Sequence, residues 1–154
     1  MRFLLAILLL TYGWRAQAAQ EATMFTASDF QELRFLQGRW KGQAPDGTDF
    51  FEEYDFPSPT SFRSRRFASD AFSDATDSSI VMLEDGRVIS RWGDFTWRAD
   101  RIEAGFVSFV PMNAPSSFSW RRASADEVEV TQRWQDEQGR DQSYTLRLQR
   151  VAPR

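Results

Sequence analysis

The stretch Phe35-Leu36-Gln37-Gly38-Arg39-Trp40-Lys41-Gly42 decides the fold that we predict for this chain. It ends a short helical segment and begins the first strand of a long series. Gly38, Trp40 and Gly42 alternate with charged or polar residues, and successive side chains of a strand point to opposite faces. Trp40 is therefore expected on the buried face. We interpret it as the plug at one end of a β-barrel.

A short helix is predicted directly before this strand. Ser28 and Gln31 have the spacing of a capping box, in which two side chains bond to each other's backbone N–H groups. The apolar residues that follow recur at helical spacing, so we expect a helix at residues 29–36 that Gly38 ends. Residues 19–27 are small and polar and are predicted to form a flexible lead-in.

Beyond Gly38 the chain has no helical periodicity. Short runs with period-two alternation are separated by turn signals, of which Asp85-Gly86 is the strongest because a type I′ turn favours such a pair. The connections are too short for parallel crossovers. Because closure removes exposed edges, the pattern favours an all-β, antiparallel up-and-down barrel of about eight to ten strands over a sandwich. The expected strands are 38–44, 49–56, 61–69, 78–84, 87–93, 94–100, 104–110, 117–123, 127–135 and 141–150.

Face parity predicts which side chains point into the barrel. The alternation of the last strand places Arg150 on the inner face, and a slip of one residue would invert any one set. These sets mix large aromatic side chains with polar groups, which indicates a cavity for a ligand, although a filled core with polar ends remains an alternative. The inward sets are Phe50, Glu52, Tyr54 and Phe56; Phe62, Ser64 and Arg66; Val88, Ser90 and Trp92; Phe106, Ser108 and Val110; Phe118, Trp120 and Arg122; Val128, Val130, Gln132 and Trp134; and Tyr144, Leu146 and Leu148.

Residues 1–18 have the pattern of a secretory signal peptide. A basic start precedes an apolar run at residues 3–10, and Ala16-Gln17-Ala18 provides the small-x-small cleavage pattern. Arg15 ends the apolar stretch well before the roughly 20 residues of a membrane span. We therefore expect cleavage after Ala18, no stable membrane span, and one exported domain at residues 28–151.

The chain contains no Cys and no His. This excludes Ser-His-Asp and Cys-His nucleophile systems, zinc sites of the usual type and haem held by His or Cys. An exported chain without disulfides is typical of a bacterial periplasm, with secretion as the alternative. Loss of Arg2 and Arg15 with the signal lowers the formal charge from −3 to −5, which argues against nucleic acid. We expect no cofactor and no metal.

The sequence Leu36-Gln37-Gly38-Arg39-Trp40-Lys41-Gly42, placed after a short helix and before a long meander, resembles the calycin superfamily. This group includes lipocalins and fatty-acid-binding proteins, and the resemblance is greatest to small exported bacterial lipocalin-like domains of unknown function. It implies that Trp40 packs at the closed end against a basic residue of the last strand, Arg150 or Arg147. Parity favours Arg150. The haem activity of the nitrobindin-like branch is not implied, because it depends on a His.

Arg66, Arg122 and Tyr54 are the candidate ligand-binding residues. A guanidinium forms two parallel bonds to a carboxylate or phosphate, so an anionic head group would fit them. The alternative is that each Arg pairs with an internal acid such as Glu52. Trp92, Trp120 and Trp134 are either walls of the same cavity or ordinary core residues.

Two further kinds of site are weighed and rejected. Asp70, Asp74 and Asp77 would offer oxygen ligands to Ca²⁺, but their spacing matches no calcium loop. Glu52 and Glu53 point to opposite faces of one strand, so they do not form the carboxylate pair of a glycosidase. We therefore expect no enzyme.

Two functional hypotheses remain. The first is an exported protein that holds a small hydrophobic or amphipathic ligand inside the barrel. This ligand is anionic if Arg66 and Arg122 bind its head group. The second is a protein-interaction or assembly module with a filled barrel, which uses surface groups such as Arg63, Arg65 and Phe67. An internal cavity favours the first hypothesis, and a contiguous exposed apolar patch favours the second.

Overall fold

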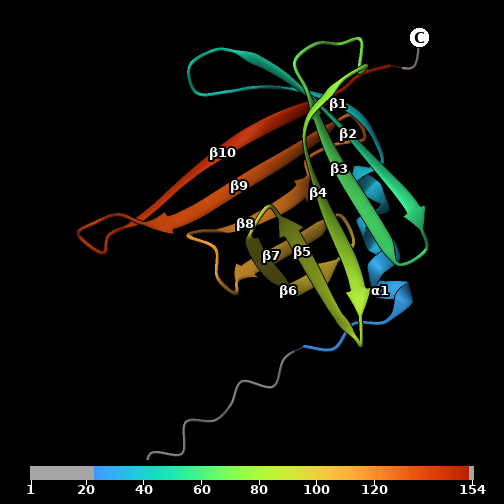
Figure 1. The fold of residues 1–154 in the computed structure, drawn as a ribbon, viewed down its shortest axis with the longest axis vertical. Coiled ribbons are helices and arrows are strands. Elements are labelled where there is room, and N and C mark those ends of the chain that lie inside the picture. Colours follow the sequence, from blue (N-terminus) through green and yellow to red (C-terminus); the bar gives the residue numbers. More distant parts are fainter. Residues whose placement is uncertain (1–22, 153–154) are drawn as a thin grey trace, which may run out of the picture.

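Ten antiparallel strands follow one another around a closed barrel in the computed structural model, which describes residues 23–152 (Figure 1). This confirms the predicted all-β up-and-down barrel with one short helix before it. The expected signal peptide at residues 1–18 lies outside the described residues. The elements are α1 (Ala27–Gln31), the 3₁₀ helix η1 (Glu32–Leu36), β1 (Gly38–Gln43), β2 (Asp49–Ser58), β3 (Ser61–Phe67), β4 (Ala75–Glu84), β5 (Arg87–Trp92), β6 (Phe95–Glu103), β7 (Phe106–Pro111), β8 (Ser117–Arg122), β9 (Glu127–Gln135) and β10 (Asp141–Arg150).

The helix begins two residues earlier than the sequence predicted. Thr26, and not Ser28, is the N-cap: its hydroxyl accepts from the Asp29 backbone N–H at 3.2 Å, and Asp29 accepts from the Thr26 N–H at 2.7 Å. The preceding Phe25 fixes this start, because its ring is 9% exposed in the core and its N–H donates to the Gly86 carbonyl at 2.7 Å. Residues 25–27 therefore belong to the folded domain and not to a flexible lead-in.

The short helical segment covers one end of the barrel. Phe30, Leu33 and Leu36 are fully buried with Trp40 in a single hydrophobic core. Gln31 donates to the Pro59 carbonyl in the β2–β3 turn at 2.6 Å. The turns at residues 59–60, 85–86, 104–105 and 123–126 lie at this closed end. The connections at 44–48, 68–74, 93–94, 112–116 and 136–140 lie at the opposite, open end.

The predicted inward face of β7 is wrong. Val107 and Phe109 are buried, and Phe106 lies outside beneath the guanidinium groups of Arg101 and Arg121, at 5.1 and 4.8 Å from its ring centroid. The residues Ser108 and Val110, which share a face with Phe106, are not part of the core either. This strand has apolar side chains on both faces, so alternation alone does not choose between them. Pairing with Trp120 and Phe118 of β8 decides the question.

The barrel closes through a short seam. β1 and β10 share only two register pairs, Trp40 with Arg150 and Lys41 with Gln149. Among the described residues, the part of β10 nearer the open end pairs with no strand on the side of β1. On its other side, β10 pairs with β9 from Asp141 to Gln149. Figure 1 shows the long β9–β10 hairpin extending away from β1 to β4. Closure therefore depends on contacts at the plugged end.

Candidate functional site

A cavity of about 260 Å³ occupies the open half of the barrel. Its lining combines buried aromatic side chains with serines, one glutamine and three charged groups. The position follows from the plug, because Trp40 and the helical segment fill the other end. The lining residues are Glu52, Tyr54, Ser64, Arg66, Asp77, Ser78, Ser79, Ser90, Trp92, Trp97, Ser116, Phe118, Trp120, Val130, Gln132, Tyr144 and Leu146.

Glu52 is the centre of the polar network in this cavity. Its Oε1 accepts from Arg66 Nε at 3.0 Å and from Arg66 Nη2 at 2.5 Å, while its Oε2 accepts from the Tyr54 hydroxyl. Glu52 and Arg66 face each other across β2 and β3 in register. The guanidinium is therefore bonded to an internal acid, which was the alternative to a free anion site.

Asp77 lies on the other side of Arg66. The two residues are register partners across β3 and β4, so an acid–base–acid row crosses three strands. Desolvation lowers the pKa of Arg66, and the neighbouring carboxylates, Glu52 foremost, outweigh it, so that the pKa is raised overall. The Arg66 guanidinium also lies over the ring of Phe50, at 4.5 Å from its centroid. Arg66 is thus held in place from several sides.

The walls of the cavity are aromatic. Trp120 contacts Tyr54 and Phe118 edge to face, with ring centroids 6.0 and 5.0 Å apart. Trp97 contacts Phe118 at 5.5 Å, and its Nε1 donates to the Ser116 carbonyl at 2.6 Å. Such edge-to-face packing fixes the rings, so these walls are preformed.

Trp92 stands at the rim, where it is 45% exposed. Its Nε1 donates to both carboxylate oxygens of Asp77, at 2.8 and 2.7 Å. The indole therefore orients the second acid of the row. The same ring also lies near Phe95, with centroids 6.1 Å apart.

Tyr54 is neutral in the folded protein. Burial first, and then the adjacent Glu52 charge, raise the pKa of its hydroxyl well above the ordinary value of 10.0. The nearby Trp120 N–H lowers the pKa of this hydroxyl, but by less than burial and Glu52 raise it. The buried Nε1 of Trp120 has no hydrogen-bond partner among the residues that the structure describes. The hydroxyl proton of Tyr54 is committed to Glu52 and is not offered to an anion.

The structure does not bring all the predicted site residues together. Glu52, Tyr54, Arg66, Trp92 and Trp120, all placed on the inner face by alternation, line the cavity. Arg122 is absent from its lining, because the inner face of β8 reaches the closed end at this residue. There its guanidinium lies 5.2 Å from the ring centroid of Phe35. Arg147 is exposed on the outer surface, 3.7 and 3.5 Å from Glu127 and Glu129.

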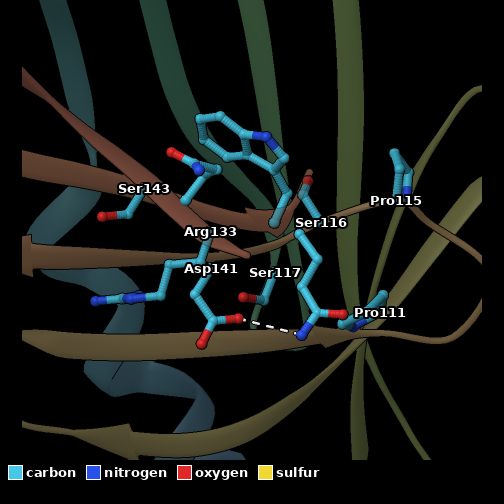
Figure 2. Close-up of a pocket in the computed structure, with 10 residues that line it drawn as sticks. Pro111, Pro115, Ser116, Ser117, Arg133, Asp141 and Ser143 are labelled. Carbon is cyan, nitrogen blue, oxygen red and sulfur yellow. Dashed lines mark hydrogen bonds between the residues drawn. The ribbon is translucent and has the colours of Figure 1, made fainter. Parts of the chain in front are cut away.

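Trp134 lines a second depression, an open groove of about 560 Å³ between the β7–β8 connection and the β9–β10 hairpin, which shares Ser116 with the cavity. Figure 2 shows Pro111, at the end of β7, and Pro115, in the connection that follows, on one side of it and Arg133, Asp141 and Ser143 of the β9–β10 hairpin on the other. Most of these side chains are exposed and polar. The barrel cavity is smaller, but it has the buried and mutually fixed groups that ligand sites usually have.

Sequence reasoning missed three features of the cavity. Trp97 was not assigned, although alternation along β6 with the buried Ala99 would have identified it. Asp77 was considered only as part of a loop, but β4 begins at Ala75 and includes it. Among the serines, alternation placed Ser64 and Ser90 inward, whereas Ser78 and Ser79 of β4 and Ser116 of the β7–β8 connection were not assigned.

The other acids do not form a site. Residues 23–152 contain no group of three or more side chains that would hold a metal ion. Glu53 pairs with Arg39 and Arg65 on the outer face of β2, and Asp55 accepts from Arg63 Nε at 3.0 Å. These carboxylates are thus separated from Glu52 by the sheet.

Comparison with known proteins supports the fold alone. No protein-family model and no curated protein matches the chain. A solved structure of a DUF3598-family protein of unknown function from Nostoc punctiforme matches 84% of this chain at 12% identity, with a TM-score of 0.51. This chain spans about half the length of that protein, since the match covers 50% of it.

Two further solved structures have lower TM-scores and do not establish a shared fold. One is a redesigned β-barrel, with a TM-score of 0.38 and 14% identity over 79% of this chain and 96% of its own. The other is EF1p2_mFAP2b bound to DFHBI, with a TM-score of 0.40 and 13% identity over 79% of this chain and 98% of its own. None of the three structures is described as an enzyme. Within residues 23–152, no helix has the length and apolar character needed to cross a membrane.

Proposed function

We propose that this protein is an exported binding protein that holds a small, largely apolar ligand in the open half of its barrel. The observation that carries this proposal is the cavity between the buried side chains of Tyr54, Trp97 and Trp120, with the Glu52–Arg66 pair on one wall. The proposal keeps the periplasmic or secreted location inferred from residues 1–18. N-terminal sequencing of the exported protein checks that part, with Ala19 as the expected first residue.

The volume limits the size of the ligand. A dry cavity of about 150 Å³ holds benzene, whereas drug-sized ligands occupy pockets from about 300 Å³ upwards. The value of about 260 Å³ lies between the two. One or two fused rings therefore fit inside the cavity, a further ring would lie at its open rim, and a long fatty acid is too large.

The alternative of a filled barrel that acts through surface groups has less support. Arg63 donates to Asp55 from Nε at 3.0 Å, and Arg65 is paired with Glu53. Phe67, expected on the same surface, is buried against Phe72, with ring centroids 5.2 Å apart. The groups assigned to a docking surface thus have partners within the protein.

A neutral fluorescent probe tests the proposal. We expect N-phenyl-1-naphthylamine to bind with a stoichiometry of one and to change the tryptophan emission, since three indoles line the cavity. Ser79→Trp places a large side chain in the cavity and should abolish binding. Ser143→Trp places the same side chain in the outer groove and should leave binding unchanged.

The same pair of variants separates the possible outcomes. If only Ser143→Trp lost binding, the probe would be shown to bind in the groove and not in the cavity. Absence of saturable binding by the unmodified protein would refute the binding function. Circular dichroism of both variants verifies that the barrel is folded.

A further inference from the structure

We propose that the cavity selects a ligand with a positively charged nitrogen, an aromatic or arylalkyl ammonium ion, and rejects the anionic counterpart. This inference rests on the binding function proposed above and names the class of ligand. It is the opposite of the expectation that an Arg-lined barrel binds a carboxylate or phosphate. It depends on the charges, the aromatic faces and the bonds already made inside the cavity.

The charges that face the cavity sum to one negative charge. Among the described lining residues, Glu52 and Asp77 are the acids and Arg66 is the one base. Arg66 lies between the two acids in the β2–β3–β4 row, and it is ion-paired to Glu52 at 2.5 Å. A positive ligand would bring this row to neutrality, whereas an anion would add a second uncompensated negative charge.

Part of the donor capacity of Arg66 is already used inside the cavity. The Nε and Nη2 groups both donate to Glu52, and the Tyr54 hydroxyl donates to the same carboxylate. A carboxylate ligand that took over these donors would displace Glu52 and leave that buried acid without its partners, and one bound at the remaining N–H groups of Arg66 would lie beside a guanidinium whose charge Glu52 already balances. An uncompensated buried charge is strongly unfavourable. The network therefore opposes an anion in two ways, by charge and by the loss of existing bonds.

Asp77 is the group that would pair with the cation. Its Oδ1 accepts from the Ser78 N–H and from Trp92 Nε1, both at 2.8 Å, while its Oδ2 accepts from the same indole N–H at 2.7 Å. A carboxylate has about four lone-pair directions, so Oδ2 keeps capacity for an ammonium donor. Trp92 holds the carboxylate at the cavity rim in this orientation.

The aromatic walls suit the same ligand. The faces of Trp, Tyr and Phe rings attract a cation, and Trp is the most favourable of them. Trp92, Trp97, Trp120 and Tyr144 all line the cavity whose polar end carries Asp77. An ammonium group attached to an aromatic ring would thus pair with Asp77 while its ring packs against the indoles.

Three indane derivatives of nearly equal shape test the inference. 2-Aminoindane is a cation at neutral pH, 2-indanol is neutral and indane-2-carboxylate is an anion. Their affinities are measured by displacement of N-phenyl-1-naphthylamine from the unmodified protein. We expect 2-aminoindane to bind roughly three- to tenfold more tightly than 2-indanol, and indane-2-carboxylate to bind most weakly. The preference for the amine should decrease as NaCl is added, because a rim charge is screened.

Two variants assign the preference to residues. Asp77→Asn keeps an acceptor for Trp92 but removes one negative charge, so 2-aminoindane should fall to the affinity of 2-indanol. Asp49→Asn is the matched control, since Asp49 pairs with Lys41 on the outer surface at 2.5 Å. Glu52→Gln should release Arg66 and raise the affinity for indane-2-carboxylate. If Glu52→Gln does not fold, Asp77→Asn still provides the test.

The outcomes distinguish this inference from the binding function. Tightest binding by indane-2-carboxylate, or equal displacement by all three compounds, would overturn the charge selection and leave the cavity as a binding site. Unchanged affinity for 2-aminoindane in Asp77→Asn would also overturn it. Failure of N-phenyl-1-naphthylamine itself to bind would refute the binding function.

Discussion

The guanidinium of Arg150 lies over the indole of Trp40, with its central carbon 4.2 Å from the ring centroid. The same guanidinium donates from Nη1 to the Gln37 carbonyl at 2.9 Å and from Nε to the Ala125 carbonyl at 3.2 Å. Trp40 in turn donates from Nε1 to the Leu36 carbonyl at 2.7 Å. These contacts join the first strand, the last strand and the helical segment where the barrel closes.

Arg150→Met should lower the free energy of unfolding by about 2–4 kcal/mol. The variant keeps an apolar side chain over Trp40 but loses the cation–π contact and leaves backbone carbonyls without a charged donor. Urea denaturation followed by tryptophan fluorescence measures the change. Arg147→Met is the control, because this exposed residue has only weak ion pairs and should change stability by less than about 0.5 kcal/mol. Equal effects of the two variants would contradict the role of Arg150 at the seam.

Gly38→Ala should be more destabilising than an equivalent change in a loop. Gly38 has φ +132°, and a Cβ at this position would lie 2.5 Å from Arg150 Nη1. Gly139→Ala is the control, since it also has a positive φ, +73°, but a Cβ there meets nothing within 4 Å. We expect about 1 kcal/mol for the loop variant and about 2–3 kcal/mol for Gly38→Ala, measured by chemical denaturation. Similar values for both would show that Arg150 moves aside without cost.

Phe25→Ala should cost about 3 kcal/mol of stability, because a ring that is 9% exposed is lost from the core. Met24→Ala should change stability by less than about 0.5 kcal/mol, because Met24 is 66% exposed. Thermal denaturation of the two variants measures the difference. A small effect of Phe25→Ala would show that residues 25–27 belong to the flexible lead-in that was predicted from the sequence.

Tyr54 makes stability depend on pH in the alkaline range. Its pKa in the folded protein is raised above 10.0 by burial and by Glu52, so the folded state holds the proton more tightly than the unfolded state. Its contribution is complete below pH 10.0 and is lost as the pH rises towards the folded pKa. Tyr54→Phe has neither this pH-dependent contribution to stability nor the hydrogen bond to Glu52.

The stability gap between the unmodified protein and Tyr54→Phe should therefore be about 1–3 kcal/mol at neutral pH and become smaller above about pH 10. Denaturation curves at several alkaline pH values measure this gap. Groups other than Tyr54 are common to both proteins, so their contributions cancel. A gap that stays constant to about pH 11 would show that the two states of Tyr54 do not differ in pKa.

The barrel could be predicted from the alternation and turn signals of the sequence, because both depend on local periodicity. The resemblance noted at the first strand implied that Trp40 packs against a basic residue of the last strand, and alternation placed Arg150 on the same inner face as Trp40 and so favoured it over Arg147. The same rule identified Glu52, Tyr54 and Arg66 as inward residues. It was insufficient where both faces of a strand are apolar, so that Phe106 was assigned inward while Val107 and Phe109 are buried.

Which of the inward residues meet depends on the tertiary structure. Parity gives the face of a side chain, but its height in the barrel depends on strand tilt and register around the whole sheet. For this reason Arg122 lies at the closed end near Phe35, while Arg66 lies between Glu52 and Asp77 near the open end. The charge of the cavity follows from that register, and this charge decides the class of ligand that we propose.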